Sequence, residues 1–438
     1  MALGKDHTCM LLDASSEVVC FGRNVAGQLG LGDTVDRGQT AGSVGEAVDF
    51  GASVAAVAIT AGCEHTCALL DDGAVKCFGQ NNFGQLGQDT TDNAGGVEGQ
   101  AVADLPAVPL DGTVTAIAGG CDSTCALMDD GSVICWGRNT FGQLGTGDSP
   151  DRLDGNDIPL VAVDLDGSVA TAIAAGEAHV CALLDDDSVK CWGRNDHGQL
   201  GQGDELDRGD SPEDLGVNLT AVSLGAEDVP TAIDCGSDYT CILLADATVK
   251  CFGENRDGQL GTGTTVDVGL LPTDMGDNLV AAETTGVQDF AAGGSTTCAV
   301  LAGDSVICWG LGSDGQTGQG SDEAVIDIGE TAPVDAGNDT FALTPAPTTT
   351  LPSASPSSAA AVTATAAPSA VPRQIGSTDM PVTLAPLGPG ETFAPTPVSS
   401  SGLDAGTEGG NSAPAHFKGG LLATIVLGAV GFLGNLFL

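Results

Sequence analysis

The chain has 438 residues, of which 65 are glycine and only 4% are aromatic, a composition typical of many turns rather than long helices. Its 13 Lys and Arg residues stand against 59 Asp and Glu, which gives a formal net charge of −46. A surface of this charge repels phosphate backbones and anionic lipid headgroups. We therefore expect no nucleic-acid partner and favour a basic, neutral or cationic one, divalent ions included.

Residues 1–343 consist of one unit repeated six times. The second cysteine of each copy stands at position 20, 77, 135, 191, 251 or 308, so successive copies lie 57, 58, 56, 60 and 57 residues apart. Each copy ends in Gly-Gln-Leu-Gly, which becomes Gly-Gln-Thr-Gly in the last one. A constant period of this length indicates an array of one supersecondary unit.

Short strands are expected within each unit. In the third copy, residues 114–120, 124–128 and 132–137 alternate between apolar and polar or small residues, which favours strands. Asp-Asp-Gly at 71–73 and at 129–131 predicts a three-residue hairpin loop with glycine in the left-handed position. Such a loop places Leu70 opposite Ala74, and counting outward places Cys67 opposite Cys77.

This register predicts a disulfide within each repeat, because the two sulfur atoms face each other across one hairpin. The chain has fifteen cysteines, no Cys-x-x-Cys and no cysteine–histidine quartet spaced for zinc, which favours a disulfide framework in an oxidising compartment. The predicted pairs are Cys9–Cys20, Cys67–Cys77, Cys125–Cys135, Cys181–Cys191, Cys241–Cys251 and Cys298–Cys308.

Three cysteines remain after this pairing. Cys63 and Cys121 hold the same position in adjacent repeats, so a bridge between neighbouring units is one alternative, with Cys235 left over. The stretch Cys-Glu-His-Thr-Cys at 63–67 also offers soft ligands for zinc, but Cys67 already has Cys77 as its predicted partner. His7, His65 and His179 recur two residues before a repeat cysteine, which indicates a packing role rather than one catalytic site.

Small units of this kind bury a core when they close radially as a propeller. The stretch 172–204, AIAAGEAHVCALLDDDSVKCWGRNDHGQLGQGD, resembles the repeat of the regulator of chromosome condensation family, which is shared with the secreted type II β-lactamase inhibitory protein. The resemblance covers roughly residues 1–345. It implies an all-β propeller, usually of seven blades, that presents loops to a protein partner. The exchange-factor and nucleosome-binding activities of the family's namesake are not expected of so acidic a chain.

The number of blades stays open at this point. Either the ring has six blades of four strands, with residues 332–344 completing the first, or an N-terminal part with a seventh blade is missing. The N-terminus has no basic and apolar regions of a signal peptide, and we therefore expect a truncated or misplaced start.

The loops after Gly-Gln-Leu-Gly are acidic, as in 32–38, 147–157 and 203–214. Clustered carboxylates are suitable calcium ligands, although none of these loops has EF-hand spacing. Arg208-Gly209-Asp210 spells the tripeptide that integrins recognise. No nucleophile elbow, phosphate-binding loop, dinucleotide motif or zinc-protease motif occurs, so we expect neither enzyme activity nor a cofactor.

The rest of the chain predicts a stalk and an anchor. Residues 344–418 are rich in Pro, Ala, Ser and Thr, which favours a disordered, O-glycosylated stalk. Residues 419–438 are apolar and long enough to span a bilayer. Small residues before this segment favour a glycosylphosphatidylinositol signal, with attachment at Gly410 or Asn411, over a retained transmembrane helix. Asn218 and Asn338 are N-glycosylation sequons.

Together these features predict a cell-surface propeller, with its blades outside the cell, that binds a protein or glycan through acidic inter-strand loops. A structural coat or cell-wall protein without a discrete ligand is the alternative. A secreted propeller hydrolase is the third hypothesis, and it would require a pocketed carboxylate pair or an activated histidine. The sequence does not identify the ligand or the oligomeric state.

Overall fold

The structure is a computed structural model. It describes residues 1–12, 15–40, 45–97, 101–151, 160–303, 305–318 and 324–325. These residues form six three-stranded sheets, one for each repeat. The strands are β1 (Ala2–Leu3), β2 (His7–Leu12), β3 (Glu17–Gly22), β4 (Ala56–Ala61), β5 (His65–Leu70), β6 (Val75–Gly79), β7 (Val114–Gly119), β8 (Ser123–Met128), β9 (Val133–Gly137), β10 (Ala170–Ala175), β11 (His179–Leu184), β12 (Val189–Gly193), β13 (Pro230–Cys235), β14 (Tyr239–Leu244), β15 (Val249–Gly253), β16 (Val287–Gly293), β17 (Thr296–Leu301) and β18 (Ser305–Gly310).

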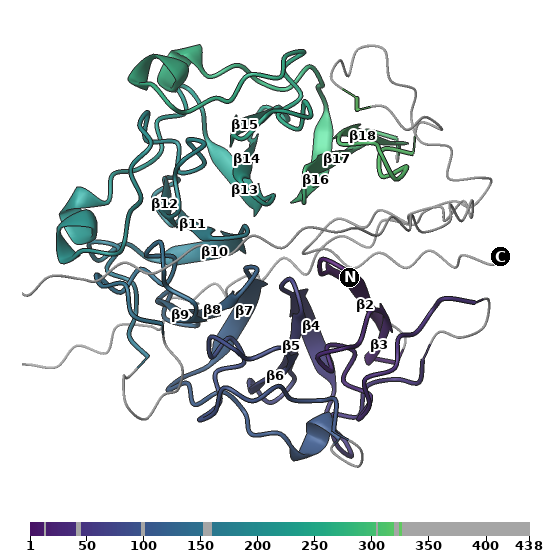
Figure 1. Cartoon of the computed structure of the whole chain (residues 1–438). Coiled ribbons are helices and arrows are strands. Elements are labelled where there is room, and N and C mark those ends of the chain that lie inside the picture. Colours follow the sequence, from purple (N-terminus) through teal and green to yellow (C-terminus); the bar gives the residue numbers. More distant parts are fainter. Residues whose placement is uncertain are drawn as a thin grey trace, which may run out of the picture. The chain divides into compact units, whose positions relative to one another are not determined.

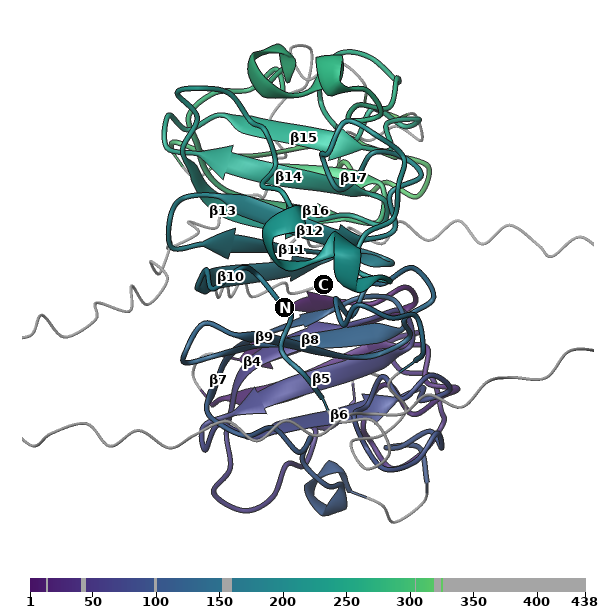
Figure 2. The same cartoon turned by 90° about the vertical axis from the view of Figure 1, so that its left-hand side faces the viewer.

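Every sheet is an antiparallel meander in chain order. The sheets follow one another around a common centre, with β4, β7, β10, β13 and β16 nearest the middle and β6, β9, β12, β15 and β18 outside (Figure 1). Figure 2 shows the sheets after a turn of 90°, with β13, β14 and β15 of one blade side by side. The all-β propeller fold predicted from the sequence is confirmed, and each sheet is one blade.

Each blade differs from the expected four-stranded unit in its last strand. This strand is reduced to isolated bridges, such as Gly79 with Ala94 and Gly193 with Arg208. The residues that follow the two bridges, Gly95 and Gly209, have φ angles of +82° and +99°. Because this left-handed conformation ends an extended run, the segment pairs at one residue and then turns away.

The core lies between neighbouring blades as well as within them. The third strand of each blade from the second to the sixth carries one aromatic residue with 0% exposure; these residues are Phe78, Trp136, Trp192, Phe252 and Trp309. A side chain of this size removes about 150–250 Å² from water, so it dominates the packing of its blade. The blades therefore depend on their neighbours for burial.

The part of the chain that the structure describes has five short 3-10 helices in the segments between blades: η1 (Val102–Asp104), η2 (Pro212–Asp214), η3 (Gly216–Asn218), η4 (Pro272–Asp274) and η5 (Gly276–Asn278). Among the described residues, no helix is long and apolar enough to cross a membrane. The segment expected to complete the first blade (332–344), the stalk (344–418) and the anchor (419–438) lie outside the described residues.

Candidate functional site

Each blade exposes loops at the two opposite ends of its strands. Because its three strands are antiparallel and consecutive, the hairpin loop between the second and third strands, such as 71–73, lies at one end. The turn between the first and second strands, such as 62–64, and the segment that follows the third strand lie at the other. We call these the hairpin end and the turn end.

A series of main-chain hydrogen bonds connects neighbouring blades at the turn end. In each of the first five blades, one N–H of the turn between the first and second strands donates to a carbonyl of the same turn in the next blade, over 2.8–3.2 Å. The pairs, donor first, are Lys5 to Cys63, Cys63 to Cys121, Cys121 to Glu177, Glu177 to Ser237, and Ser237 to Gly294. We call this series the turn ladder. It positions each blade on the next through equivalent atoms.

Disulfides occur at all six pairs that the hairpin register predicts. Cys67 lies directly opposite Cys77, and the Cα atoms of each pair are 4.1 Å apart. All twelve cysteines are between 0% and 4% exposed. The bonds are Cys9–Cys20, Cys67–Cys77, Cys125–Cys135, Cys181–Cys191, Cys241–Cys251 and Cys298–Cys308.

The structure also assigns the three remaining cysteines. Cys63 and Cys121 form a seventh disulfide, which joins the turns of the second and third blades with a Cα–Cα distance of 4.4 Å. Unlike the hairpin cysteines, both are partly exposed. Cys235 is a free thiol with 5% exposure at the end of β13. The sequence shows that Cys63 and Cys121 hold equivalent positions in their repeats. Whether their sulfur atoms meet depends on how closely the two blades approach.

The buried histidines connect blades through a repeated set of side chains. His65 Nε2 lies 2.9 Å from Thr124 Oγ1 in the next blade, and this hydroxyl donates to the Gln85 carbonyl over 2.9 Å. Trp136 Nε1 donates to the same carbonyl over 3.0 Å. Because the single hydroxyl proton goes to Gln85, Thr124 Oγ1 can only accept, and Nε2 of His65 carries the proton.

The same contact recurs at two other interfaces. His7 Nε2 lies 2.8 Å from Thr66 Oγ1, and His179 Nε2 lies 3.0 Å from Thr240 Oγ1. Burial lowers the pKa of His7 to about 4 and that of His179 to about 3, and it lowers the pKa of His65 to about 3. The three rings are therefore neutral at physiological pH and hold blades together.

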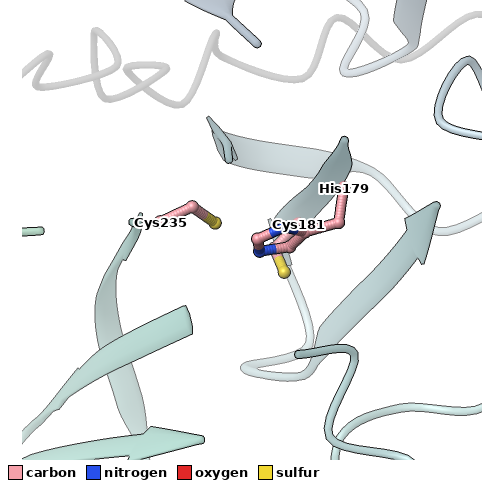
Figure 3. Close-up of side chains that lie close together, drawn as sticks. All are labelled: His179, Cys181 and Cys235. Carbon is pink, nitrogen blue, oxygen red and sulfur yellow. The ribbon is translucent and has the colours of Figure 1, made fainter. Parts of the chain in front are cut away.

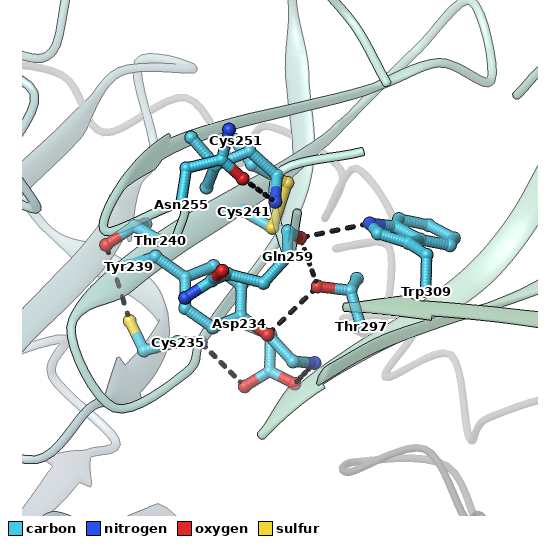
Figure 4. The surroundings of a disulfide bond; sticks show 12 residues. Asp234, Cys235, Tyr239, Thr240, Cys241, Cys251, Asn255, Gln259, Thr297 and Trp309 are labelled. Carbon is cyan, nitrogen blue, oxygen red and sulfur yellow. Dashed lines mark hydrogen bonds between the residues drawn. A yellow bond between two sulfur atoms is a disulfide. The ribbon is translucent and has the colours of Figure 1, made fainter. Parts of the chain in front are cut away.

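A tyrosine takes the histidine's place in the fifth blade (Figure 4). The Tyr239 hydroxyl donates to the Thr296 carbonyl over 2.8 Å and lies 2.9 Å from Thr297 Oγ1. Thr297 Oγ1 and Trp309 Nε1 donate to the Gln259 carbonyl over 2.8 and 3.0 Å. Two different side chains thus serve equivalent interfaces, which is evidence for packing rather than catalysis.

His179, Cys181 and Cys235 lie together between the fourth and fifth blades (Figure 3), with one ligand atom of each within 4.8 Å of the others. Cys181 is bonded to Cys191, so it offers no thiolate to a metal. Burial raises the pKa of the Cys235 thiol, and its Sγ lies 3.8 Å from Thr240 Oγ1. While the Cys181–Cys191 disulfide is intact, these three side chains pack in the interface between the two blades and do not form a metal site.

The zinc interpretation of the stretch 63–67 does not fit its contacts. Cys63 and Cys67 are both in disulfides, to Cys121 and Cys77. His65 is engaged with Thr124, so the stretch has no thiolate and no free Nε2 lone pair for a metal.

The acidic loops after Gly-Gln-Leu-Gly use their carboxylates within the loop. In the fourth blade, Asp207 Oδ1 accepts the Asn195 N–H over 2.8 Å, and Asp204 Oδ1 accepts the Leu206 N–H over 3.0 Å. The other oxygen of Asp204 forms an ion pair with Arg208 at 2.7 Å. The first blade repeats this arrangement at 33–37. These carboxylates build the loop, which leaves fewer of their oxygens for calcium.

Three of these loops display an aliphatic side chain at the tip. Val35, Leu206 and Val266 hold the same position in the first, fourth and fifth blades and are 60%, 64% and 69% exposed. The N–H groups of Val35 and Leu206 are fixed by the preceding aspartates, Asp33 and Asp204. The loop therefore presents a rigid apolar tip to solvent.

Arg208, Gly209 and Asp210 do not form a displayed adhesive loop. The Arg208 side chain is 17% exposed, and its guanidinium also donates to the Leu206 carbonyl over 2.6 Å. Gly209 packs closely on the third blade, since a Cβ there would lie 2.5 Å from the Gly142 carbonyl oxygen. The arginine is committed to its own loop.

The described arginines all lie at the turn end, where they pair with carboxylates or cover aromatic rings. The guanidinium of Arg138 lies 4.9 Å from the centre of the Phe83 ring, and that of Arg194 lies 5.4 Å from Phe141. Within the described residues, the large apolar side chains that are exposed are Val and Leu, and none is aromatic.

The hydrolase hypothesis requires a pocketed carboxylate pair or an activated histidine. A hollow of about 280 Å³ beside the hairpin of the second blade is lined by Asp72 as its one carboxylate, with no histidine. Asp234 on β13 has its pKa raised to about 7 by loss of solvation. Its oxygens accept the N–H groups of Cys235 and Ala292, each over 2.9 Å, so this carboxyl joins the fifth and sixth blades.

The predicted modification sites divide between the described and the undescribed residues. Asn218 lies at the end of η3 and is exposed, as is Thr220 of its sequon. Asn338, Gly410 and Asn411 lie outside the described residues.

Comparison with known proteins agrees with this geometry. The family model of the RCC1-like domain matches residues 17–371. The chain is 31% identical over 328 residues to the ultraviolet-B receptor UVR8 of Arabidopsis thaliana, covering 73% of this chain and 67% of that protein. It is 28% identical to the human E3 ubiquitin-protein ligase HERC2, covering 74% of this chain but 6% of that much longer protein.

Solved structures show the same fold at low identity. Human WBSCR16 superposes with a TM-score of 0.60 at 19% identity, covering 76% of this chain and 80% of that one. Yeast RCC1 (Prp20), solved with Kap60, superposes with a TM-score of 0.59 at 20% identity, covering 76% and 74%. The repeats, the six blades and the matched family model lead to one conclusion: this chain belongs to the RCC1-like domain family.

Proposed function

We propose that this protein is a cell-surface propeller that binds a protein partner at its turn end. RCC1-like propellers commonly mediate protein interaction. The observation that carries the proposal is the set of aliphatic tips: Val35, Leu206 and Val266 are at least 60% exposed at one position of three blades. Apolar side chains held rigidly in solvent lower the entropy cost of binding, because the loop is already ordered.

The chemistry of these tips favours a protein over a glycan. Glycan recognition uses exposed aromatic rings, and the large exposed apolar residues among those described are aliphatic. Two aromatic rings, Phe83 and Phe141, lie beneath the guanidinium groups of Arg138 and Arg194. The acidic loops around the tips attract a basic rim on the partner.

The disulfide framework supports placing the blades outside the cell. Seven disulfides join fourteen of the fifteen cysteines. Such bonds persist in oxidising compartments and are rare in the cytosol. In this proposal the stalk (344–418) holds the propeller away from the membrane, and the segment 419–438 directs a lipid anchor at Gly410 or Asn411. Release of the protein from cells by phosphatidylinositol-specific phospholipase C tests the anchor.

Two triple variants, neither of which changes the net charge, test whether the partner binds at the turn end. Proximity labelling on living cells that display the full-length chain tags the proteins next to it. We expect Val35→Ser, Leu206→Ser and Val266→Ser together to reduce the labelled partner at least tenfold. The control combines Val57→Ser, Val169→Ser and Val229→Ser, which are 40–53% exposed valines at the hairpin end.

Two outcomes contradict the proposal. If the hairpin-end control loses the partner instead, the binding end is assigned wrongly. If neither variant changes the labelled proteins and the chain is retained in an insoluble wall fraction, the structural coat is the better description.

A further inference from the structure

We propose that the Cys63–Cys121 bond is a redox-labile site that an extracellular dithiol reductant opens while the propeller stays folded. The choice of this disulfide rests on the blades themselves, and the extracellular reductant rests on the location proposed above. Cys63 and Cys121 are partly exposed, whereas the twelve cysteines of the hairpin bonds are between 0% and 4% exposed. Thiol–disulfide exchange requires access of the attacking thiolate to sulfur, so exposure selects this bond.

The charged side chains near this disulfide also allow an anionic thiolate to approach it. Each of the two cysteines is followed by an acidic residue, Glu64 or Asp122. Arg23 pairs with Glu64 at 2.9 Å, and Arg138 pairs with Asp122 at 3.2 Å. The repulsion that these carboxylates would exert on an anion is therefore partly cancelled by the two arginines.

The fold tolerates the loss of this bond because other interfaces are built without one. Along the turn ladder, the places of Cys63 and Cys121 are taken by Lys5, Glu177, Ser237 and Gly294 in the other blades. The ladder hydrogen bonds form there over 2.8–3.2 Å with no disulfide. Cys63 N–H still donates to the Cys121 carbonyl over 3.0 Å, and this bond does not depend on sulfur.

The chemistry of opening is a two-step exchange. A thiolate of the dithiol attacks one sulfur of the bond, a mixed disulfide forms, and the other cysteine leaves as a thiolate that takes a proton from water. The second thiol of the reductant then displaces the remaining cysteine, which also ends as a thiol. Two electrons pass to the protein, and the reductant becomes a disulfide.

Opening this bond changes the turn end, where it joins the second and third blades. Without the covalent link, the two turns keep the hydrogen bond from Cys63 N–H to the Cys121 carbonyl but gain freedom to move apart. The hairpin disulfides remain and keep each blade intact. The result is a reversible change in the rigidity of one face of the propeller.

The test is differential alkylation of the full-length protein. Samples are treated with dithiothreitol for increasing times, blocked with iodoacetamide and mapped by mass spectrometry. We expect Cys63 and Cys121 to be alkylated at least tenfold faster than the twelve hairpin cysteines. Equal rates for all seven bonds would overturn the proposal.

A variant separates lability from loss of fold. Cys63→Ser with Cys121→Ser is expected to keep the six hairpin bonds and the β circular-dichroism spectrum, and to exchange amide hydrogen faster at 62–64 and 120–122. As the control, Cys67→Ser with Cys77→Ser removes one of the buried hairpin disulfides instead of the partly exposed one. The proposal is also wrong if the first variant unfolds, or if its exchange at those turns equals that of the wild type.

Discussion

A glycine before each buried histidine sets how closely two blades approach. At Gly62 an added Cβ would lie 2.2 Å from Cε1 of His65 and 2.3 Å from the Gly120 carbonyl oxygen. Gly293 holds the same place in the sixth blade, and nothing lies within 4 Å of a Cβ there. Neither glycine has a positive φ, so the two sites differ in space rather than in backbone conformation.

We therefore expect Gly62→Ala to destabilise the protein and Gly293→Ala to leave its stability nearly unchanged. Overpacking of a tight interface typically costs about 1–3 kcal/mol. Urea unfolding of the two variants, followed by circular dichroism, measures the difference in midpoint. Equal midpoints would show that the contact at His65 relaxes without cost.

The buried histidines also predict a pH dependence of stability. The pKa of His179 is about 3 in the folded state and 6.5 when unfolded, so the unfolded chain binds more protons between these values. The stabilising contribution of neutral His179 is present above pH 6.5 and is lost as the pH falls toward 3. The loss amounts to at most about 1.4 kcal/mol per pH unit for one group.

We expect His179→Gln to flatten the fall in unfolding free energy between pH 6.5 and 4. Asp234, whose pKa is raised to about 7, contributes with the opposite sign, so the variant must be compared with the wild type at each pH. His197→Gln is the control: the hydrogen bond to Asp267 opposes partial burial and raises the pKa of His197. The stabilising contribution of His197 is fully present below pH 6.5 and is lost as the pH rises above that value, so this variant should leave the slope between pH 6.5 and 4 nearly unchanged. An unchanged slope in His179→Gln would contradict this account.

At the scale of the blade, the hairpin turn determines which residues face each other. Gly73 and Gly131 have φ angles of +84° and +80°, as the Asp-Asp-Gly sequences predict. The same position is Asp187 in the fourth blade and Ala247 in the fifth, with φ angles of 61° and 66°. A residue with a Cβ in this region carries a cost of about 1–2 kcal/mol.

Asp187→Gly and Ala247→Gly should accordingly stabilise the protein by about 1 kcal/mol each. The gain is smaller than the strain removed because glycine is more flexible in the unfolded chain. Thermal unfolding of each variant measures the shift, and Asp185→Gly, in the same turn but outside the left-handed region, should lower the melting temperature. Lower melting temperatures for all three would show that these turns are not strained.

The blade was predictable from local sequence, whereas the contacts between blades were not, apart from the Cys63–Cys121 bridge that equivalent positions suggested as one alternative. Period-two patterns and the Asp-Asp-Gly turn gave the register that places Cys67 opposite Cys77. The reduction of the fourth strand to single bridges depends on glycines such as Gly95, which looked like ordinary loop residues. The loop aspartates suggested a calcium site because their partners, including Asn195 and Arg208, become neighbours only when the loop closes.

At the scale of the molecule, equivalent turns are joined in series from the first blade to the sixth. The turn ladder repeats one hydrogen-bond geometry at five interfaces, but a disulfide reinforces one of them. Contacts of this kind join residues about one repeat apart, so no local pattern specifies them. Because the ladder geometry repeats, a cysteine pair that forms a disulfide at one interface should also form one at another.

Glu177 and Ser237 occupy the ladder positions of Cys63 and Cys121, and the Glu177 N–H donates to the Ser237 carbonyl over 2.8 Å. We expect Glu177→Cys with Ser237→Cys to form a second disulfide between blades under oxidising conditions. Closing a loop of about 60 residues restricts the unfolded chain by about 4 kcal/mol in the loop-entropy model, so the melting temperature should rise. Non-reducing peptide mapping identifies the bond, and calorimetry with and without reductant measures its effect. The single variants should show no such rise, and two free thiols in the double variant would mean that the interfaces differ in geometry despite their common hydrogen bond.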